Sequence, residues 1–425
     1  MITRNGLIQA AIIAFLTGLV VVAAMNLVPD RRELRRAVAT TITTSDPAFL
    51  RSMNGLFGSN MLEGNRIELL VNGDEIFPAM LDAIRAAETS ITFETYVYWS
   101  GSIAEDFAEA LAERARAGVA VRVMLDWFGS VPMDPDMIAR MEDAGVQVTR
   151  FRPIHWYTID RVNNRTHRKL LIVDGRVGFT GGVGIADEWR GDARNAEEFR
   201  ENHYRVTGPV VAMMQGAFAS NWVEDSTEIL RGDAFFPPLE PQGDTVAQLA
   251  VSSTGSRNYI HMMLMTALSA AETNIRIATP YFVPDDIAVA QLVAARERGV
   301  QVDILLPGPE INKPPVRRAS RALWGPLLEA GVTIREYQPT FLHAKLLIVD
   351  EVLTSVGSTN FDERSFRLND EANLNVYDRD FARAHIALFE ADMADAREIT
   401  LREWQDRSWT TRMADWGWSW LRPQM

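Results

Sequence analysis

The chain has 425 residues, of which 47% are hydrophobic and 23% are charged, so it is long enough for two domains or one large pseudo-symmetric one. Its formal net charge of −13 and isoelectric point of about 5.1 disfavour non-specific nucleic-acid binding, because proteins that grip a nucleic-acid backbone usually carry a basic face. Cysteine is absent, which excludes disulfides, thiolate nucleophiles and cysteine-based metal sites.

The first element predicted along the chain is an N-terminal transmembrane helix. Residues 7–28 form an uncharged apolar run that is long enough to span a bilayer core. Arg4 precedes the run and an arginine cluster follows it, so the positive-inside bias favours a cytoplasmic body. A cleaved export signal is the alternative. We assign residues 1–36 to the membrane anchor and its basic flank.

The remaining chain divides into a linker, two halves and a tail. Residues 37–64 are rich in Thr, Ser, Asn and Gly and are predicted to be a juxtamembrane linker. From residue 65 the sequence contains an internal duplication, which predicts a first half over residues 65–235 and a second half over residues 236–400. Residues 401–425 form a separate C-terminal tail.

The two halves carry matched strand–helix–strand patterns. The sequence AAET occurs just before residues 91 and 275, and each copy leads into β-branched and aromatic residues that predict a strand. Helical patterns follow at residues 103–117 and 286–298, and each ends at a glycine, as expected just past a helix end. This order gives parallel crossovers, so each half should be an α/β unit, an αβα sandwich.

Each half then contains the pattern His-x-Lys-x-x-x-x-Asp, within an apolar stretch that predicts a buried strand ending in a turn. The residues of the two copies are His167, Lys169 and Asp174, and His343, Lys345 and Asp350. Because alternate strand residues share a face, the His and Lys of each copy point the same way. Of the 43 Lys and Arg residues only three are Lys, and two of these stand in the pattern; the third is Lys313.

Two such patterns hold the groups needed to cleave a phosphodiester without a metal. Two imidazoles can act as nucleophile and acid, because both protonation states are accessible near neutral pH. Two lysines place positive charge where negative charge develops in the transition state. A carboxylate on the far ring nitrogen can fix each tautomer. We therefore predict no metal and no other cofactor, with the complete site formed at the seam of the two halves.

Matched positions continue downstream of both copies. Residues 181–184 (GGVG) parallel residues 357–360 (GSTN), which include Ser358 and Asn360. Further on, a glutamate stands at a matched position in each half, at Glu201 and Glu371. His203, two residues after Glu201, either lines the site or packs in the core.

The tail holds five of the eleven tryptophans of the chain, namely Trp404, Trp409, Trp416, Trp418 and Trp420. Tryptophan favours the bilayer interface, so the tail is a candidate membrane contact. An amphipathic helix that packs on the body is the alternative.

On these residues the chain resembles the phospholipase D superfamily, and within it the bacterial cardiolipin synthases. The resemblance extends from about residue 65 to about residue 402 and includes the stretches ATPYFVPDD, GSTNFDERSF and HYRVTGPVV. It implies that one motif histidine forms a phosphohistidine and the other protonates the departing alcohol. We assign His167 as nucleophile and His343 as acid, and the reverse assignment stays open.

The resemblance also implies roles for the other candidate residues. Four side chains would surround the phosphoryl group: Lys169, Lys345, Asn360 and, nearby, Ser358. Glu201 and Glu371 would each orient a histidine. Asp174 and Asp350 belong to the candidate catalytic set as motif members, although we expect them to close the strand-end turn. Gly184 departs from the family, in which many members have Asn at this position.

The function implied is phosphatidyl transfer on an anionic phospholipid, namely cardiolipin synthesis from phosphatidylglycerol, at the cell inner membrane. A hydrolase that yields phosphatidic acid would share the intermediate, and the sequence does not separate the two. A nuclease is disfavoured by the acidic charge and the anchor, so no nucleic-acid partner is expected. A non-catalytic lipid-binding scaffold is a further alternative. The oligomeric state is not readable, because the duplication already supplies both halves of a site.

Overall fold

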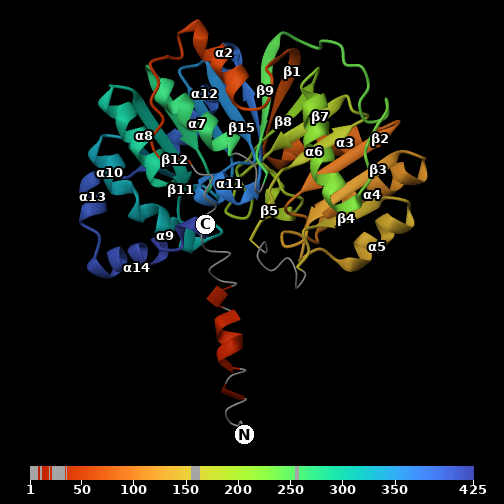
Figure 1. Cartoon of the computed structure of the whole chain (residues 1–425), viewed down its shortest axis with the longest axis horizontal. Helices are drawn as coiled ribbons and strands as arrows, with labels where there is room; N and C mark the ends of the chain where they lie inside the picture. The colour runs from red at the N-terminus through yellow and green to blue at the C-terminus, as the bar shows by residue number, and fades with distance from the viewer. Residues whose placement is uncertain are drawn as a thin grey trace.

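The computed structural model describes residues 8–9, 12–18, 20–21, 34, 36–154, 163–253 and 258–425. Within this part of the chain, one sheet of fifteen strands runs through both halves, which lie side by side (Figure 1). At its centre β1 (Leu62–Val71) pairs antiparallel with β9 (Thr245–Val251), and so joins the first half to the second.

The strands on the two sides of this centre correspond one to one. On the first-half side the order from β1 outward is β8 (Asn202–Thr207), β7 (Val177–Gly181), β6 (Leu170–Val173), β2 (Ser90–Thr95), β3 (Ala120–Asp126) and β4 (Gln147–Phe151). On the second-half side the order from β9 outward is β18 (Ala372–Val376), β15 (Leu353–Gly357), β14 (Leu346–Val349), β10 (Asn274–Ala278), β12 (Gln301–Pro307), β13 (Thr333–Tyr337) and the extra edge strand β19 (Ala396–Glu398). The predicted parallel crossovers are confirmed, since β2 and β3 are parallel and so are β10 and β12.

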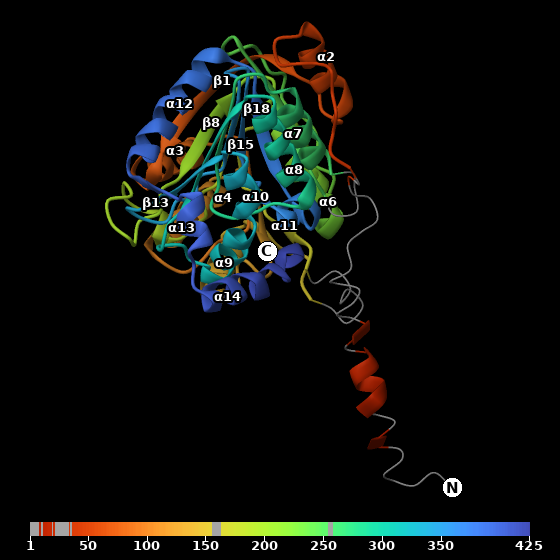
Figure 2. The same cartoon turned by 90° about the vertical axis from the view of Figure 1, so that its left-hand side faces the viewer.

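Helices cover both faces of the sheet. In the first half they are α3 (Asn72–Arg85), α4 (Ser102–Arg116), α5 (Pro135–Asp143) and α6 (Val211–Ser226). In the second half they are α7 (Tyr259–Ala270), α8 (Asp286–Glu297), α9 (Pro314–Ala322), α10 (Trp324–Glu329) and α12 (Arg379–Ala394). In Figure 2, α3 and α12 lie on one side of the sheet and α6, α7 and α8 on the other. The predicted helices are α4 and α8, and Gly118 and Gly299 behind them have φ values of +94° and +92°, a conformation that glycine adopts without strain.

Residues 37–64 do more than link the anchor to the body. They contain α2 (Pro47–Leu56), which Asp46 caps by accepting from the Ala48 N–H. Phe49 and Met53 of this helix are buried in the core of the second half. This short helix therefore packs on the folded body through its two buried side chains, and β1 starts at residue 62.

Half of the predicted anchor, residues 7–28, lies outside the described residues. Residues 12–18 are helical, and the side chains of Ile12, Phe15 and Leu16 are exposed. In the part of the chain that the structure describes, no helix is long and apolar enough to cross a membrane.

The C-terminal tail has a packed face and an exposed face. It forms α13 (Leu401–Gln405) and α14 (Trp409–Ser419). The indole of Trp404 donates to the Arg321 carbonyl (2.7 Å), and the buried Asp415 carboxylate pairs with Arg321 (2.7 Å), which attaches α14 to α9. Three tryptophans remain mostly exposed: Trp409 (72%), Trp416 (60%) and Trp420 (70%). The packing interpretation of the tail is confirmed for one face, and the membrane contact of the exposed face stays a prediction.

Candidate active site

The two motif copies meet at the seam between the halves. The short strand β5 (Arg165–Thr166), just before the first copy, pairs in parallel with β17 (Asn369–Asp370), just before the second-half glutamate. The His167 N–H continues this pairing by donating to the Asp370 carbonyl (2.8 Å). The second copy is placed in the same way beside the first-half glutamate. Each motif histidine thus lies next to the glutamate of the other half.

Each of these glutamates makes a direct contact with the histidine of the opposite half. Nδ1 of His167 lies 3.0 Å from the Glu371 carboxylate, and Nδ1 of His343 lies 2.5 Å from Glu201 Oε2. The pKa of Glu371 is lowered, so its ionised carboxylate can only accept, and in His167 the proton belongs on Nδ1 and the lone pair on Nε2. Burial raises the pKa of Glu201, and Lys345 Nζ lies 2.9 and 3.0 Å from the two ring nitrogens of His343. The glutamates therefore lie where the expected orienting role requires, but the pairing crosses between the halves.

The two motif lysines are buried beside the histidines. Lys169 Nζ donates to the His167 carbonyl (2.8 Å) and Lys345 Nζ to the His343 carbonyl (2.7 Å). Burial lowers the pKa of Lys169 to about 8 and the pKa of Lys345 to about 7, although the nearby glutamates oppose both shifts. These ammonium groups can hold an anionic phosphoryl group. No group of three or more His, Asp or Glu side chains suited to a metal ion occurs among the described residues.

Both motif histidines are held neutral by their surroundings. Burial lowers the pKa of His167 to about 4, against the opposing effect of Glu371. Burial also lowers the pKa of His343 well below its usual value, with Lys345 and Lys169 adding to the shift. Each histidine thus responds to the lysine of the other half as well as its own, so the motif residues form a single site. A neutral His167 can offer Nε2 as a nucleophile.

Ser358 supports a glutamate rather than lying free for a phosphoryl oxygen. Its hydroxyl donates to Glu371 Oε2 (2.5 Å), and the Asn369 side-chain amide donates to Oε1 (3.1 Å). These bonds fix the carboxylate that orients His167. Burial acts to raise the pKa of Glu371, but His167, Lys169 and the Ser358 hydroxyl together lower it, so the carboxylate stays ionised.

The first half holds its glutamate by a different arrangement. Gly182 stands where the second half has Ser358, and a Cβ there would lie 2.4 Å from both Glu201 carboxylate oxygens. The donor comes instead from the indole of Trp189, whose Nε1 lies 3.2 Å from Glu201. Trp189 also explains Gly184, where a Cβ would lie 3.0 Å from its ring. The tryptophan occupies the space that an asparagine at position 184, the counterpart of Asn360, would need.

Asp174 and Asp350 lie apart from this chemistry. The Asp174 carboxylate accepts from the backbone N–H groups of residues 88–90 (2.7 to 3.1 Å). Asp350 does the same for residues 272–274 and also accepts from the Thr44 hydroxyl (2.6 Å). As expected for motif members that close a turn, they tie the strand end to the preceding loop, and their place in the candidate catalytic set stays a prediction.

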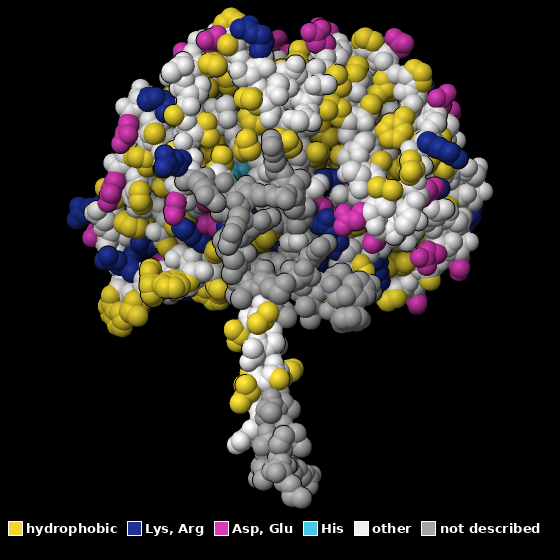
Figure 3. Space-filling view, in the orientation of Figure 1, with side chains coloured by type: hydrophobic (Ala, Val, Ile, Leu, Met, Phe, Trp, Pro, Cys, Tyr) yellow, Lys and Arg dark blue, Asp and Glu magenta, His cyan; other side chains and the backbone are white. Residues whose placement is uncertain are grey.

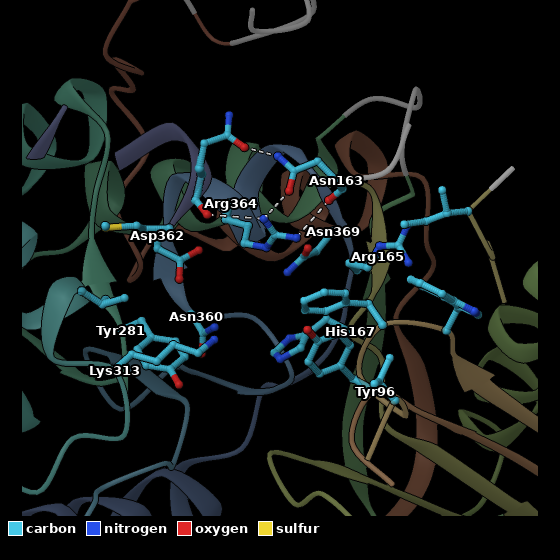
Figure 4. A pocket seen from close by; sticks show the side chains of 17 residues that line it. Tyr96, Asn163, Arg165, His167, Tyr281, Lys313, Asn360, Asp362, Arg364 and Asn369 are labelled. Carbon is cyan, nitrogen blue, oxygen red and sulfur yellow. Dashed lines mark hydrogen bonds between the residues drawn. The ribbon is translucent and has the colours of Figure 1, made fainter. Parts of the chain in front are cut away.

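A pocket of about 930 Å³ opens onto His167 (Figure 4). Polar residues line its interior, namely Lys313, Asn360, Asp362, Arg364 and Asn369. Apolar residues line the remainder, and Phe128 and Val131 among them are mostly exposed. His343 does not line the pocket, because the rings of Trp189 and Phe341 pack against it (5.1 and 5.4 Å between centroids). The open access to His167 favours it as the nucleophile.

Sequence reasoning did not identify several residues of the pocket. Tyr281 lines the pocket, and Trp189 contacts Glu201 and His343 outside it. Both residues break the internal repeat instead of continuing it, so only a comparison of mismatched positions would find them. Lys313 was visible as the third lysine of the chain but had no motif around it. His203 is buried outside the pocket, and burial lowers its pKa to about 3, so it packs as a neutral side chain.

Comparisons with known proteins agree with this geometry. The family described as "Cardiolipin synthase, PLD-like domain" matches twice, over residues 80–212 and 264–393. Cardiolipin synthase A of Pseudomonas syringae pv. syringae (strain B728a) is 35% identical over 366 residues, which cover 84% of this chain and 74% of that protein. Cardiolipin synthase 2 of Bacillus anthracis is 33% identical over 350 residues, covering 81% and 68%. The crystal structure of phosphatidylserine synthase from Haemophilus influenzae Rd KW20 shares the fold, with a TM-score of 0.68 at 12% identity, over 88% of this chain and 98% of that one.

Proposed function

This chain belongs to the phospholipase D-like cardiolipin synthase family, and we propose that it joins two phosphatidylglycerol molecules into cardiolipin with release of glycerol. The observation that carries the proposal is the crossed pairing of each motif histidine with the glutamate of the other half, at a pocket that ends on His167. A site of this kind supplies nucleophile, acid and phosphoryl-binding cations without a metal.

In the first step the donor phosphodiester binds between Lys169 and Lys345. Nε2 of His167 attacks phosphorus, while Glu371 stabilises the positive charge that develops on the imidazole. The phosphorus–oxygen bond to glycerol breaks, and the glycerol oxygen takes a proton from His343. The negative charge of the bound phosphodiester favours the protonated form of His343 that this step needs. The product is a phosphatidyl group on His167.

In the second step His343, now neutral, takes the proton of an acceptor hydroxyl. The acceptor oxygen attacks phosphorus and the nitrogen–phosphorus bond of His167 breaks, which returns His167 to the free imidazole and His343 to its protonated form. If the acceptor is the glycerol of a second phosphatidylglycerol, the product is cardiolipin. If water reaches the intermediate first, the product is phosphatidic acid.

The pocket suits an amphiphilic substrate. Charged and amide side chains surround the end near His167, while Trp127, Phe128 and Val131 are among the apolar residues of its lining. A lipid headgroup would bind at the polar end and its acyl chains would extend along the apolar part. A nucleic acid offers no comparable apolar portion, and the net charge of −13 opposes its approach.

The enzyme is proposed to work at the inner membrane with its body in the cytoplasm. Exposed apolar side chains support this, both in residues 12–18 and on the outer face of α14, where hydrophobic side chains gather at the lower left of Figure 3. Tryptophan is favoured at the bilayer interface, so α14 would place its outer face among lipid headgroups. The anchor and α14 would together hold the pocket close to its substrate.

A product assay tests the function. Detergent-solubilised protein is incubated with phosphatidylglycerol, and the lipids are separated by thin-layer chromatography. We expect cardiolipin and an equal amount of glycerol, and activity that persists in EDTA. Phosphatidic acid without cardiolipin would identify a hydrolase instead. Loss of both products in His167→Ala, with the protein folded, separates an enzyme from a scaffold.

A quenching experiment tests the membrane contact of α14. The protein is reconstituted into vesicles that contain brominated lipids, which quench nearby tryptophans. We expect the quenched fraction to fall when Trp409, Trp416 and Trp420 are replaced together by Ser, whereas replacement of the exposed Ile229 by Ser should leave it unchanged. Equal quenching in both variants would contradict a bilayer contact by this face.

A further inference from the structure

Lys313 lies in the same pocket as His167 but has no part in the two steps above. In Figure 4 it stands beside Tyr281 and Asn360, across the pocket from His167. Its Nζ lies 5.0 Å from the centroid of the Tyr281 ring. It forms no ion pair within the described residues, and its exposed side chain is open to the pocket. A cation in this position is available to a ligand.

The local structure fixes Lys313 on the pocket wall. Pro314 and Pro315 follow it directly and begin α9, so the backbone after the lysine is restricted. The Tyr281 hydroxyl donates to the Asn312 side-chain oxygen (2.6 Å), which ties the preceding residue to the same wall. The ammonium is therefore held at a defined place rather than carried on a free loop.

The other charged groups on this side of the pocket already have partners. Arg364 donates to the side-chain oxygen and to the carbonyl of Asn163 (2.7 and 2.9 Å). Asp362 accepts from the Ser365 N–H (2.7 Å), and burial raises its pKa to about 7. Burial lowers the pKa of Lys313, and the charge of Asp362 opposes this shift. Lys313 is thus the cation on this wall that keeps its donors for a bound anion.

Two amide oxygens complete the arrangement. Asn360 and Asn369 line the pocket, and their Oδ1 atoms, which are buried, lack a hydrogen-bond partner among the residues described. An unpaired buried acceptor costs free energy, which a hydroxyl donor from a ligand would recover. An ammonium for a phosphate, next to acceptors for hydroxyl groups, matches the chemistry of a glycerol phosphate headgroup.

We propose that Lys313 binds the phosphate of the acceptor phosphatidylglycerol, while Asn360 and Asn369 accept hydrogen bonds from its glycerol hydroxyls. This inference rests on the proposed function and assigns Lys313 to the second step alone. There the acceptor oxygen forms its bond to phosphorus, the bond from phosphorus to His167 Nε2 breaks, and the hydroxyl proton passes to His343. Binding of the acceptor phosphate makes a lipid glycerol compete better with water for the intermediate.

Two reactions of the same intermediate separate this role from others. In the first, the full-length enzyme forms cardiolipin from phosphatidylglycerol, so the acceptor carries a phosphate. In the second, radiolabelled free glycerol exchanges into phosphatidylglycerol, so the acceptor carries none. Both reactions use the same donor lipid and the same His167 adduct. A residue that binds the acceptor phosphate should matter for the first reaction and not for the second.

For Lys313→Met we expect cardiolipin formation to fall about tenfold or more, as for a lost charge-assisted contact, with glycerol exchange within about twofold of the parent enzyme. Lys313→Arg should recover part of the cardiolipin formation, because it keeps the positive charge. Arg318→Met is the control: it removes a positive charge from an exposed position of α9 and should change neither reaction. An equal fall in both reactions, or no fall in either, overturns the proposal. If the parent enzyme exchanges glycerol but forms no cardiolipin, the proposed function itself fails.

Discussion

The Glu371 carboxylate lies 3.0 Å from Nδ1 of His167, although the two residues come from opposite halves of the chain. Glu201 and His343 repeat the relationship in the other direction, at 2.5 Å. Neither half can therefore orient its own histidine. Under the proposed mechanism the duplication is needed for catalysis as well as for symmetry, because each half supplies the glutamate that contacts the motif histidine of the other.

Replacement of Glu371 by Gln tests this crossed pairing. The amide oxygen can still accept from His167, but it carries no charge to stabilise the imidazolium, so kcat should fall by about 10²- to 10⁴-fold. If Glu371 serves His167, the defect persists with a nitrophenyl phosphodiester, whose leaving group needs no acid. Glu201→Gln should instead be largely rescued by this substrate, because Glu201 serves the acid. A reversed pattern of rescue would contradict the pairing.

The pH dependence of kcat/KM follows from the lowered pKa values of the site. Protonation of His167, with a pKa of about 4, removes the nucleophile, so the rate should fall as the pH drops through this value. With a nitrophenyl phosphodiester, whose leaving group needs no proton from His343, deprotonation of Lys345 and Lys169, with pKa values of about 7 and about 8, removes the phosphoryl-binding charge, so the rate should also fall as the pH rises through this range. Fixed-time assays at pH values across this range measure both the acid and the alkaline limb of the pH profile. In Lys345→Arg the alkaline limb should move upward, and an unmoved limb would exclude this lysine as its cause.

Gly182→Ala should damage the site with little effect elsewhere. Its new Cβ would lie 2.4 Å from the Glu201 oxygens, so the carboxylate must move away from His343. We expect kcat to fall at least about tenfold while the protein stays folded. Gly216→Ala is the matched control, since nothing lies within 4 Å of the added Cβ in α6. Comparable activity in the two variants would show that the position of Glu201 tolerates such a displacement.

Asp350→Ala should reduce stability and spare the chemistry. The variant loses the acceptor for three backbone N–H groups and for the hydroxyls of Thr44 and Thr273, which should lower the free energy of unfolding by about 1–3 kcal/mol. Burial acts to raise the pKa of Asp350, but these hydrogen bonds outweigh it and lower the pKa. The stabilisation is therefore present above the unfolded-state pKa and is lost as the pH falls through the lowered value. Denaturant unfolding at two pH values measures this stabilisation. An unchanged midpoint together with a large loss of kcat would contradict a purely structural role for Asp350.

Much of the fold could be predicted because the sequence repeats it. The identical LLIV segments of β6 and β14 are buried at every position, and a glycine ends each of the helices α4 and α8, so local pattern and tertiary structure agree. The helix α2 could not be predicted in the same way. It has no counterpart in the repeat, and its burial depends on a long-range contact with the core of the second half.

The candidate site was predicted in its residues but not in its pairing. Spacing alone places His167 and Lys169 on one strand face, yet it cannot tell which glutamate each histidine meets. That depends on the contact between β5 and β17, two strands of two residues each, which bring distant segments together at the seam. The differences between the halves, such as Trp189 over Gly184, likewise become visible only when both halves are folded together.

Trapping of the covalent intermediate tests the central claim most directly. The enzyme is mixed briefly with phosphatidylglycerol labelled at phosphorus, quenched in alkali, which preserves phosphohistidine, and digested for mass spectrometry. The label should appear on the peptide that contains His167, and it should be absent in His167→Ala. In His343→Ala the label should still appear on this peptide when a nitrophenyl phosphodiester is the donor. A label on His343, or turnover of the lipid with no labelled histidine, would contradict the assignment of His167 as the nucleophile.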